Sequence, residues 1–495
     1  MVLLQILAML ALLNFHEVMT DKKNILDNII GFFSPSLGVK RQMWRRSYEA
    51  ASHSGRNSSM MHAGNNGPNT EIGNALETLR NRSRMFVRNN GWAARAITAI
   101  VNNTVGEGIR PAPTGNLSNV KNIKKVWDDW AGSTECDYYG KSTFYGLQNI
   151  IMREIAEAGD CIILRRRVNA PIPIKLQVLE PDQLDITKNS INEMGFARLG
   201  VQFNKLGMKI GYWVFPYHPN DYNGMDISLQ SVFISNDDVL HPFEILRAGQ
   251  VRGVPQGTAA FMKLSDFSDY EDAQLILQKA ASCSVAFVRG SIPQAGDDDN
   301  NERVEHLTPG MVKYLGENEE VTFNNASSPG GYGEYSKKIL QGIAAAYSIT
   351  YEMLTMDYSN VNFTSGRMAK IDVSSHFRDL QYNMLVPQLC VPVWNWFMNA
   401  AVISGLIKKP ISCSAEDWTA PRVQQLDPVK ETNARVLQIQ SGLSTLSECI
   451  REDGRDPDEF FDEYAQDMER LKKLGINLSS VQPVQSIEIN NNGKS

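Results

Sequence analysis

The chain has 495 residues, of which 42% are apolar and 21% are charged, and these proportions are ordinary for a folded protein. Its length exceeds what one hydrophobic core usually organises, so we expect several domains or one elongated subunit with several parts. The net charge of −6 argues against tight binding of DNA phosphates as the main task, because such affinity comes from clustered lysines and arginines.

The chain opens with an apolar run, VLLQILAMLALLNF, which is too short to span a bilayer. Three explanations stay open: a start assigned too far upstream, with Met19 opening the protein; an amphipathic extension; and a secretory signal, the least favoured because no small-residue cleavage site closes the run. Residues 37–70 are rich in Arg, Ser, Asn and Gly and predict an extended or mobile arm.

Residues 71–103 carry apolar side chains at helical spacing, with a break around Asn89, Asn90 and Gly91. Between 104 and 245, Gly and Pro punctuate β-rich runs such as CIILRRRV, IKLQVLEP, GYWVFPY and SVFI. Two helices, at about 119–131 and 144–158, are inserted among these strands. The pattern predicts an α+β domain.

A long helix is predicted from about 255 to 288, with Pro255 at its start and Gly290 followed by Pro293 at its end. The acidic loop GDDDNNE and the run VEHLTPGMVKYLGENEEVTF come next, and the period of that run, close to two, indicates strands. After SSPGGYG, helices are predicted at 334–347, around 367–385 and around 387–405.

The last folded part, 427–475, is predicted to be helical, and 478–495 to be a disordered tail. Its final helix has Asp456 at the N-cap, Pro457 at the first position and Gly475 beyond the end. We expect this helix to have basic residues in its last turn and a buried apolar face, which are Lys472 and Lys473, and Phe460 or Phe461, Tyr464, Met468 and Leu471.

No catalytic, cofactor or metal site is predicted. Gly140, Lys141 and Ser142 resemble the end of a phosphate-binding loop, but Glu135 stands where the loop needs a glycine. The cysteines form no C-x-x-C pair and the histidines no H-x-x-x-H pair. A solvated acidic loop explains Asp297, Asp298 and Asp299 more simply than a bound divalent ion.

A basic cluster lies on or beside the first helical segment and contains Arg80, Arg82, Arg84, Arg88 and Arg95. Together with nearby aromatic residues it resembles a nucleic-acid-binding patch. Salt bridges at a subunit interface, combined with a solvated helix face, are an equally weighted alternative.

Nine strings, in order, make the chain similar to the lambda-type family of phage portal proteins from about Trp44 to Ile476. They are RSRMFVRNN at 82–90, VNNTVGEGIRP at 101–111, the pair Trp127 and Trp130 with Cys136 and Asp137, EAGDCIILRRR at 157–167, LQVLEPDQLD at 176–185, VLHPFEILRAGQVRGVP at 239–255, LTPGMVKYLGENEEV at 307–321, ILQGIAAAYSITYEMLTMDYSNVNFTSGR at 339–367 and WTAPRVQQLDPVKETNARVLQIQSGLSTLSECIREDGRDPDEF at 418–460. One departure is Thr364, Ser365, Gly366 and Arg367, where relatives commonly carry a Ser-Ser-x-Arg-like string.

The resemblance implies an α+β portal fold assembled as a cyclic ring, and it divides the chain into regions. They are an N-terminal extension and arm (1–70), an α+β wing (71–255), a stem helix (256–290), a small β-containing clip (291–326), a stem return (327–353), a channel loop (354–367), a long helix with the wing and crown connection (368–426), a helical crown (427–477) and a disordered tail (478–495).

The resemblance also implies a role without catalysis, as the channel for packaging and ejecting double-stranded DNA. Residues expected to face this DNA are Tyr358, Asn360, Asn362, Thr364, Ser365, Arg367 and Lys370, and those expected to face partners at the clip are Asp297, Asp298, Asp299 and Glu302. Sequence-specific contacts would hinder sliding, so mixed or acidic walls are expected.

The implied partners are about eleven further copies in a twelve-fold ring, the terminase large subunit, the head–tail connector, and the major capsid and scaffold proteins. The implied location is the capsid vertex of the virion, and the host cytoplasm during assembly. A membrane-surface protein and an inactive prophage remnant are the alternatives.

Overall fold

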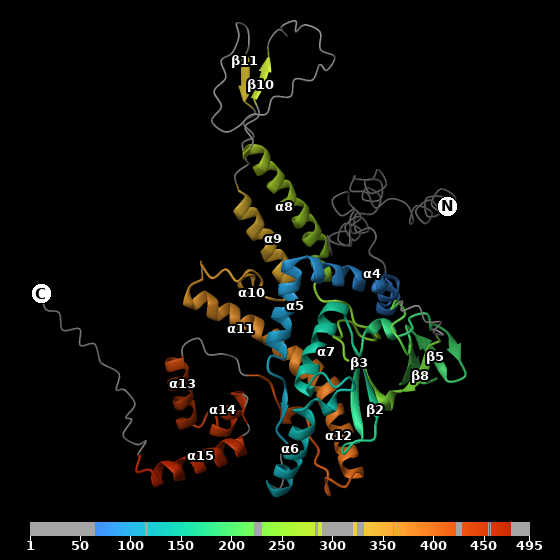
Figure 1. Ribbon diagram of the computed structural model, residues 1–495, viewed down its shortest axis with the longest axis vertical. Coiled ribbons are helices and arrows are strands. Elements are labelled where there is room, and N and C mark those ends of the chain that lie inside the picture. The colour runs from blue at the N-terminus through green and yellow to red at the C-terminus, as the bar shows by residue number, and fades with distance from the viewer. Residues whose placement is uncertain are drawn as a thin grey trace, which may run out of the picture. The chain divides into compact units, whose positions relative to one another are not determined.

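The computed structural model describes residues 65–113, 117–221, 230–282, 286–289, 320–323, 331–359, 361–421, 428–453, 455 and 457–476 (Figure 1). The chain divides into two compact units, Met1–Gly67 and Pro68–Ser495, and every element named below belongs to the second. No helix in these ranges is long and apolar enough to cross a membrane.

The helical segment predicted at 71–103 is confirmed as α4 (Pro68–Asn89) and α5 (Gly91–Thr104). Asn90 causes the break, because its side chain accepts hydrogen bonds from the backbone amides of Trp92 and Ala93 and so starts a new helix. The two inserted helices are also confirmed, as α6 (Leu117–Ala131) and α7 (Phe144–Ala158). Gly159 ends α7 with a φ of +98°, a backbone conformation that favours glycine.

Antiparallel sheets confirm the α+β prediction. One has the order β3-β2-β9, from β2 (Ile162–Arg167), β3 (Ile174–Leu179) and β9 (Val239–Leu240). The other runs in chain order through β4 (Ile191–Asn192), β5 (Gly195–Arg198), β6 (Val201–Phe203), β7 (Lys209–Val214) and β8 (Val232–Ser235). A short pair joins β1 (Arg110–Pro111) to β12 (Trp418–Thr419).

The long helix predicted at 255–288 is wrong at both ends. A 3₁₀ turn, Thr258–Ala260, precedes α8 (Phe261–Ser282), and Gly257 before it has a φ of +75°. Beyond α8, β10 (Ala286–Arg289) pairs antiparallel with β11 (Glu320–Phe323). The predicted stem helix of 256–290 therefore includes a strand, because the Ala-Phe-Val-Arg run pairs with a segment more than 30 residues later, and local periodicity cannot detect such a pairing.

Helices resume as predicted with α9 (Tyr332–Ala346), which packs against α8 (Figure 1). After α10 (Tyr351–Thr355), one continuous helical path replaces the two predicted helices: α11 (Phe363–Asp379), the π-helical η7 (Leu380–Cys390) and α12 (Val391–Ile403). Pro387 lies inside η7. Proline has no amide hydrogen to donate, and in a regular α-helix its ring clashes with the carbonyl four residues earlier. The wider π-helical turns, in which hydrogen bonds join residues five apart, tolerate both features.

Three C-terminal helices follow: α13 (Pro428–Gln440), α14 (Leu446–Glu452) and α15 (Pro457–Lys473). The prediction for the start and last turn of α15 is confirmed at Pro457, Lys472 and Lys473, whereas Asp456 lies outside the described residues. The predicted buried face is wrong for this single chain, since Tyr464 is 54% and Met468 42% exposed. An apolar stripe does not specify whether its partner belongs to the same chain.

The main core is centred on Trp127, which is fully buried. Its ring centroid lies 5.0 Å from that of Trp394 and 4.9 Å from that of Phe397, both on α12. The ring of Trp418 on β12 lies edge-on to Trp127, with 6.2 Å between the ring centroids. Residues almost 300 positions apart therefore build one core.

Candidate functional site

The predicted channel residues gather around the start of α11. Asn362 is the N-cap, and its Oδ1 accepts a hydrogen bond from the Ser365 backbone amide at 2.8 Å. The first turns of α11 carry Thr364, Ser365, Arg367 and Lys370, and the segment before the helix carries Tyr358. Asn360 lies outside the described residues.

The predicted channel loop, 354–367, is wrong in its bounds. Residues 354–355 end α10 and 363–367 begin α11, so the connecting segment is 356–362. Met356 ends α10 in the left-handed conformation, with a φ of +57°. Sequence reasoning treated the Thr-Ser-Gly-Arg string as loop because it did not recognise the capping function of Asn362.

The surface around these residues is polar and weakly charged. Tyr358 is 60% exposed, Arg367 is exposed and Lys370 is half-buried. Hydrogen bonds from the Ser359 hydroxyl and amide lower the pKa of Asp357, so this carboxylate stays ionised. A surface with one exposed guanidinium and an exposed carboxylate can touch a phosphate backbone without holding it tightly.

The predicted clip residues Asp297, Asp298, Asp299 and Glu302 lie outside the described residues. Their role stays a prediction.

A buried ionic cluster, which sequence reasoning missed, surrounds Asp160. The carboxylate has no exposed surface and accepts from Arg252 Nε at 2.5 Å, and it contacts His241 Nε2 at 3.0 Å and Arg80 Nη2 at 3.4 Å. The Gly253 amide donates to it at 3.2 Å. Asp160 begins the run into β2, while Arg252 comes from a loop about 90 residues later, so the cluster joins distant segments.

Electrostatics keeps Asp160 ionised. Burial by itself would raise the pKa of Asp160, but Arg252, His241 and Arg80 outweigh burial and hold the pKa well below its ordinary value. Burial also lowers the pKa of His241. Since each oxygen of Asp160 accepts from at least one donor, the cluster serves as a structural tie between distant segments.

The predicted basic cluster is divided among several environments. Arg80 is buried beside Asp160, and Arg84 Nη2 pairs with Glu180 at 2.8 Å and Asp182 at 2.7 Å. Arg95 donates to the Met353 carbonyl. Arg82 and Arg88 are exposed. These contacts lie within the chain, so the five arginines do not form a single nucleic-acid-binding patch, and Arg80 is buried away from any neighbouring subunit.

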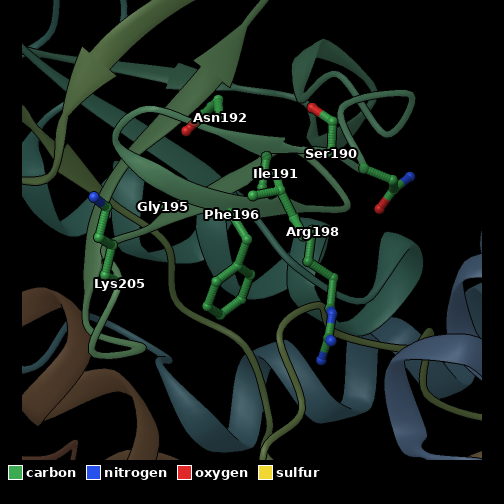
Figure 2. A pocket seen from close by; sticks show the side chains of 9 residues that line it. Ser190, Ile191, Asn192, Gly195, Phe196, Arg198 and Lys205 are labelled. Atoms are coloured by element: carbon green, nitrogen blue, oxygen red, sulfur yellow. The ribbon is translucent and has the colours of Figure 1, made fainter.

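A shallow pocket lies on the five-stranded sheet (Figure 2). Figure 2 shows the ring of Phe196 between the side chains of Lys205 and Arg198. Ile191, on its rim, is 90% exposed. The lining has no carboxylate, thiol or imidazole.

Comparison with known proteins gives one family and several relatives. Residues 54–381 match the model of "Phage portal protein, lambda family". The chain is 24% identical over 426 residues to the probable portal protein of Halomonas phage phiHAP-1, covering 81% of this chain and 82% of the relative. It is 21% identical over 470 residues to portal protein B of Escherichia phage lambda, covering 83% and 85%.

Among solved structures, chains of gene transfer agent particles match this chain. A chain in the virion of the native particle has 13% sequence identity and a TM-score of 0.46, over 77% of this chain and 94% of that chain. A chain in the neck of the native particle has 13% identity and a TM-score of 0.44, over 76% and 94%.

Proposed function

Because this chain belongs to the lambda family of phage portal proteins, we propose that its copies associate head to tail into a closed ring of about twelve subunits at one capsid vertex. The family match over residues 54–381 is the observation that carries the proposal. This range runs from α4 to the first residues of η7. Portal function itself follows from that family and from the curated relatives.

Double-stranded DNA would pass through the ring without sequence-specific contact. The polar, weakly charged start of α11 supports this role, since Arg367 can touch phosphates while Asp357 limits their retention. We assign Tyr358, Asn362, Thr364, Ser365 and Arg367 to the channel wall.

We propose the wing, stem, clip and crown regions as the family resemblance implies them, with two changes to their bounds. The stem helix ends at Ser282, and β10 and β11 belong to the clip. The clip would dock the terminase large subunit and later the head–tail connector, while other surfaces would meet the major capsid and scaffold proteins in the virion. This role is structural and does not require the chain to catalyse a reaction.

Purified protein tests the proposal through its mass in solution and negative-stain images of the same sample. Rings with a central hole and a mass near twelve subunits are expected. A stable monomer or dimer at every salt concentration, with or without scaffold protein, would contradict a ring-forming portal and favour an inactive remnant.

A further inference from the structure

The core face of the five-stranded sheet continues past the core that it covers. Val201 on β6 and Tyr212 on β7 are buried on this face, in a second, smaller core. The strands beyond them carry Phe196, which stands opposite Phe203, and Ile191, which stands opposite Phe196 and is 90% exposed. Cross-strand partners share a face, so apolar side chains extend past this core to the end of the sheet.

The pocket in Figure 2 lies on this open part of the face. Its floor is the ring of Phe196, which stacks on the ring of Phe203 with 5.1 Å between the centroids and 15° between the planes. Figure 2 shows Phe196 and Arg198 pointing to one side of the sheet and Asn192 pointing to the other, as the alternation of strand side chains requires. A turn at this end of the sheet adds Leu206, which is 83% exposed. An open apolar surface of this kind is typical of a binding site for another protein.

Two cations stand on either side of the Phe196 ring. Arg198 Cζ lies 5.9 Å from the ring centroid, and Figure 2 shows Lys205 on the opposite side. Both side chains are exposed, and neither has an ion pair within the residues that the structure describes. Glu193 lies in the turn between β4 and β5 and does not line the pocket. The pocket therefore combines an apolar floor with two positive charges, which fit an apolar side chain that has carboxylates on both sides.

The pocket borders an open strand edge. β4 is the last strand of its sheet, and among the described residues it pairs only with β5. The Ala197 amide donates to the Ser190 carbonyl at 2.7 Å, so these two residues form a hydrogen-bonded pair of the antiparallel ladder. The next pair, Ile191 and Phe196, is then a non-hydrogen-bonded pair. The amide and the carbonyl of Ile191 consequently point away from β5, towards the open edge.

We propose that this end of the sheet binds an extended segment of another protein as an added strand beside β4. The outward amide and carbonyl of Ile191 would hydrogen-bond to the main chain of the segment, and an apolar side chain of the segment would lie in the pocket on Phe196. A second copy of this chain that added its own β4 would bring a second Arg198 and a second Lys205 to the same place, so the charges favour a different, acidic partner. The proposal goes beyond the ring and does not depend on it.

The strand pairing also determines where the acidic residues of the segment should stand. Arg198 comes two residues after Phe196, and Lys205 comes two residues after Phe203 on the antiparallel neighbour, so the two cations lie at opposite ends of the pocket. Side chains return to the same face of a strand at every second residue. The expected segment therefore has one acidic residue two positions before its apolar residue and another two positions after it. The added strand would lie about 10 Å from β5, a distance that long basic and acidic side chains can span together.

Fluorescence anisotropy with the purified full chain tests this mode of binding. The probe is a labelled peptide with Glu-Thr-Phe-Thr-Glu between serines, which places both glutamates on the same face as the phenylalanine. Two control peptides carry Lys-Thr-Phe-Thr-Lys and Thr-Glu-Phe-Glu-Thr, and the second keeps the composition but moves the glutamates to the other face. The probe should bind at least about tenfold more tightly than either control.

Variants of the chain test the two parts of the site. Arg198→Glu with Lys205→Glu should reverse the preference, so that the lysine peptide binds more tightly than the glutamate peptide. Lys408→Glu with Lys409→Glu, at two exposed lysines elsewhere, makes the same charge change and should leave the preference unchanged. Ile191→Pro should weaken binding of the glutamate peptide at least about tenfold, because proline removes the outward amide at a place that an edge strand tolerates. Ile191→Val keeps the amide and should bind normally, and circular dichroism checks that each variant is folded.

Equal binding of the three peptides, or a preference that survives the reversal of Arg198 and Lys205, would overturn the proposal. Absence of binding to the unmodified chain would overturn it as well. If the charge reversal then changed the mass of the protein in solution, a second copy would be the occupant of the β4 edge. Negative-stain images of the same samples keep this proposal apart from the proposed function, because rings that form without any peptide binding would overturn the strand site alone.

Discussion

Asp160 holds a fully buried carboxylate between two guanidinium groups and an imidazole. Its partners come from α4, from the segment after β9 and from the loop before α8, so one ionised side chain ties together parts of the chain that no local interaction connects. A buried ion pair adds little stability compared with apolar side chains in the same place, but removing one partner lowers the stability strongly because the other charge stays buried and unpaired.

Asp160→Asn should therefore lower the free energy of unfolding by about 3–5 kcal/mol, because it leaves the charge of Arg252 buried without a carboxylate and removes one of the two carboxylates that pair with Arg80. Urea unfolding at pH 7 measures the change. Asp237→Asn, at an exposed acid, is the matched control and should change stability by less than about 0.5 kcal/mol. An equal effect of both substitutions would show that Asp160 is not a structural tie.

Glu154 on α7 should make stability depend on pH. Burial, with Glu180 next in importance, raises the pKa of Glu154 to about 7, and its Oε2 has no hydrogen-bond partner among the described residues. The folded state then holds a proton that the unfolded state, with a pKa of about 4.3, has released. Stability is therefore lost as the pH rises from about 4.3 to 7.

Glu154→Gln removes that loss. The excess stability of the variant over the unmodified chain should grow by about 2.5 kcal/mol between pH 5 and pH 8, within a limit of about 3.7 kcal/mol that is set by about 1.36 kcal/mol for each of about 2.7 pKa units. Unfolding curves at the two pH values give the comparison. Glu193→Gln, at an exposed position, should show no such pH dependence, and a Glu154→Gln curve parallel to the unmodified chain would contradict the assigned burial.

At the scale of elements, α7 has the predicted bounds because its signals are local: Thr143 caps its start and Gly159 ends it. Local signals also place α4, α5 and α9. The end of α8 was predicted wrongly because β10 is stabilised by its pairing with β11, more than 30 residues away. The start of α11 was missed because an asparagine cap in a polar string looks like a turn.

Asn362→Ala should destabilise the first turn of α11 by about 1 kcal/mol, since the Ser365 amide loses its acceptor. Hydrogen exchange at the first-turn amides should accelerate several-fold, while exchange in α7 stays unchanged. Asn362→Asp keeps a capping oxygen and should exchange like the unmodified chain. Equal acceleration by Ala and Asp would rule out a capping role.

At the scale of the molecule, the core is built from both halves of the described chain. Trp127 and Phe144 come from α6 and α7, whereas Trp394 and Phe397 come from α12. The β1 and β12 pair, Arg110 opposite Thr419, joins the same regions. Regions that the sequence separates into wing and long helix therefore share a core.

Trp127→Ala should lower the free energy of unfolding by about 3–5 kcal/mol, because it opens a cavity between the two halves of the core. Unfolding should remain a single cooperative transition, with its midpoint at a lower denaturant concentration. Tyr138→Ala, at a tyrosine that is 46% exposed, should change stability much less. If Trp127→Ala separated unfolding into two transitions, the halves would not share one cooperative core.

The sequence by itself determined the α+β class, most helix positions, the absence of a recognisable phosphate loop and the family resemblance, because spacing, caps and ordered strings are local properties. Only the tertiary structure decided that Arg80 and Arg84 are paired within the chain, that Asp160, His241 and Arg252 form a buried cluster, and that Tyr270 of α8 packs against Tyr335 of α9. These features depend on residues that are distant in the chain and meet only after folding, so no local pattern of residue types contains them.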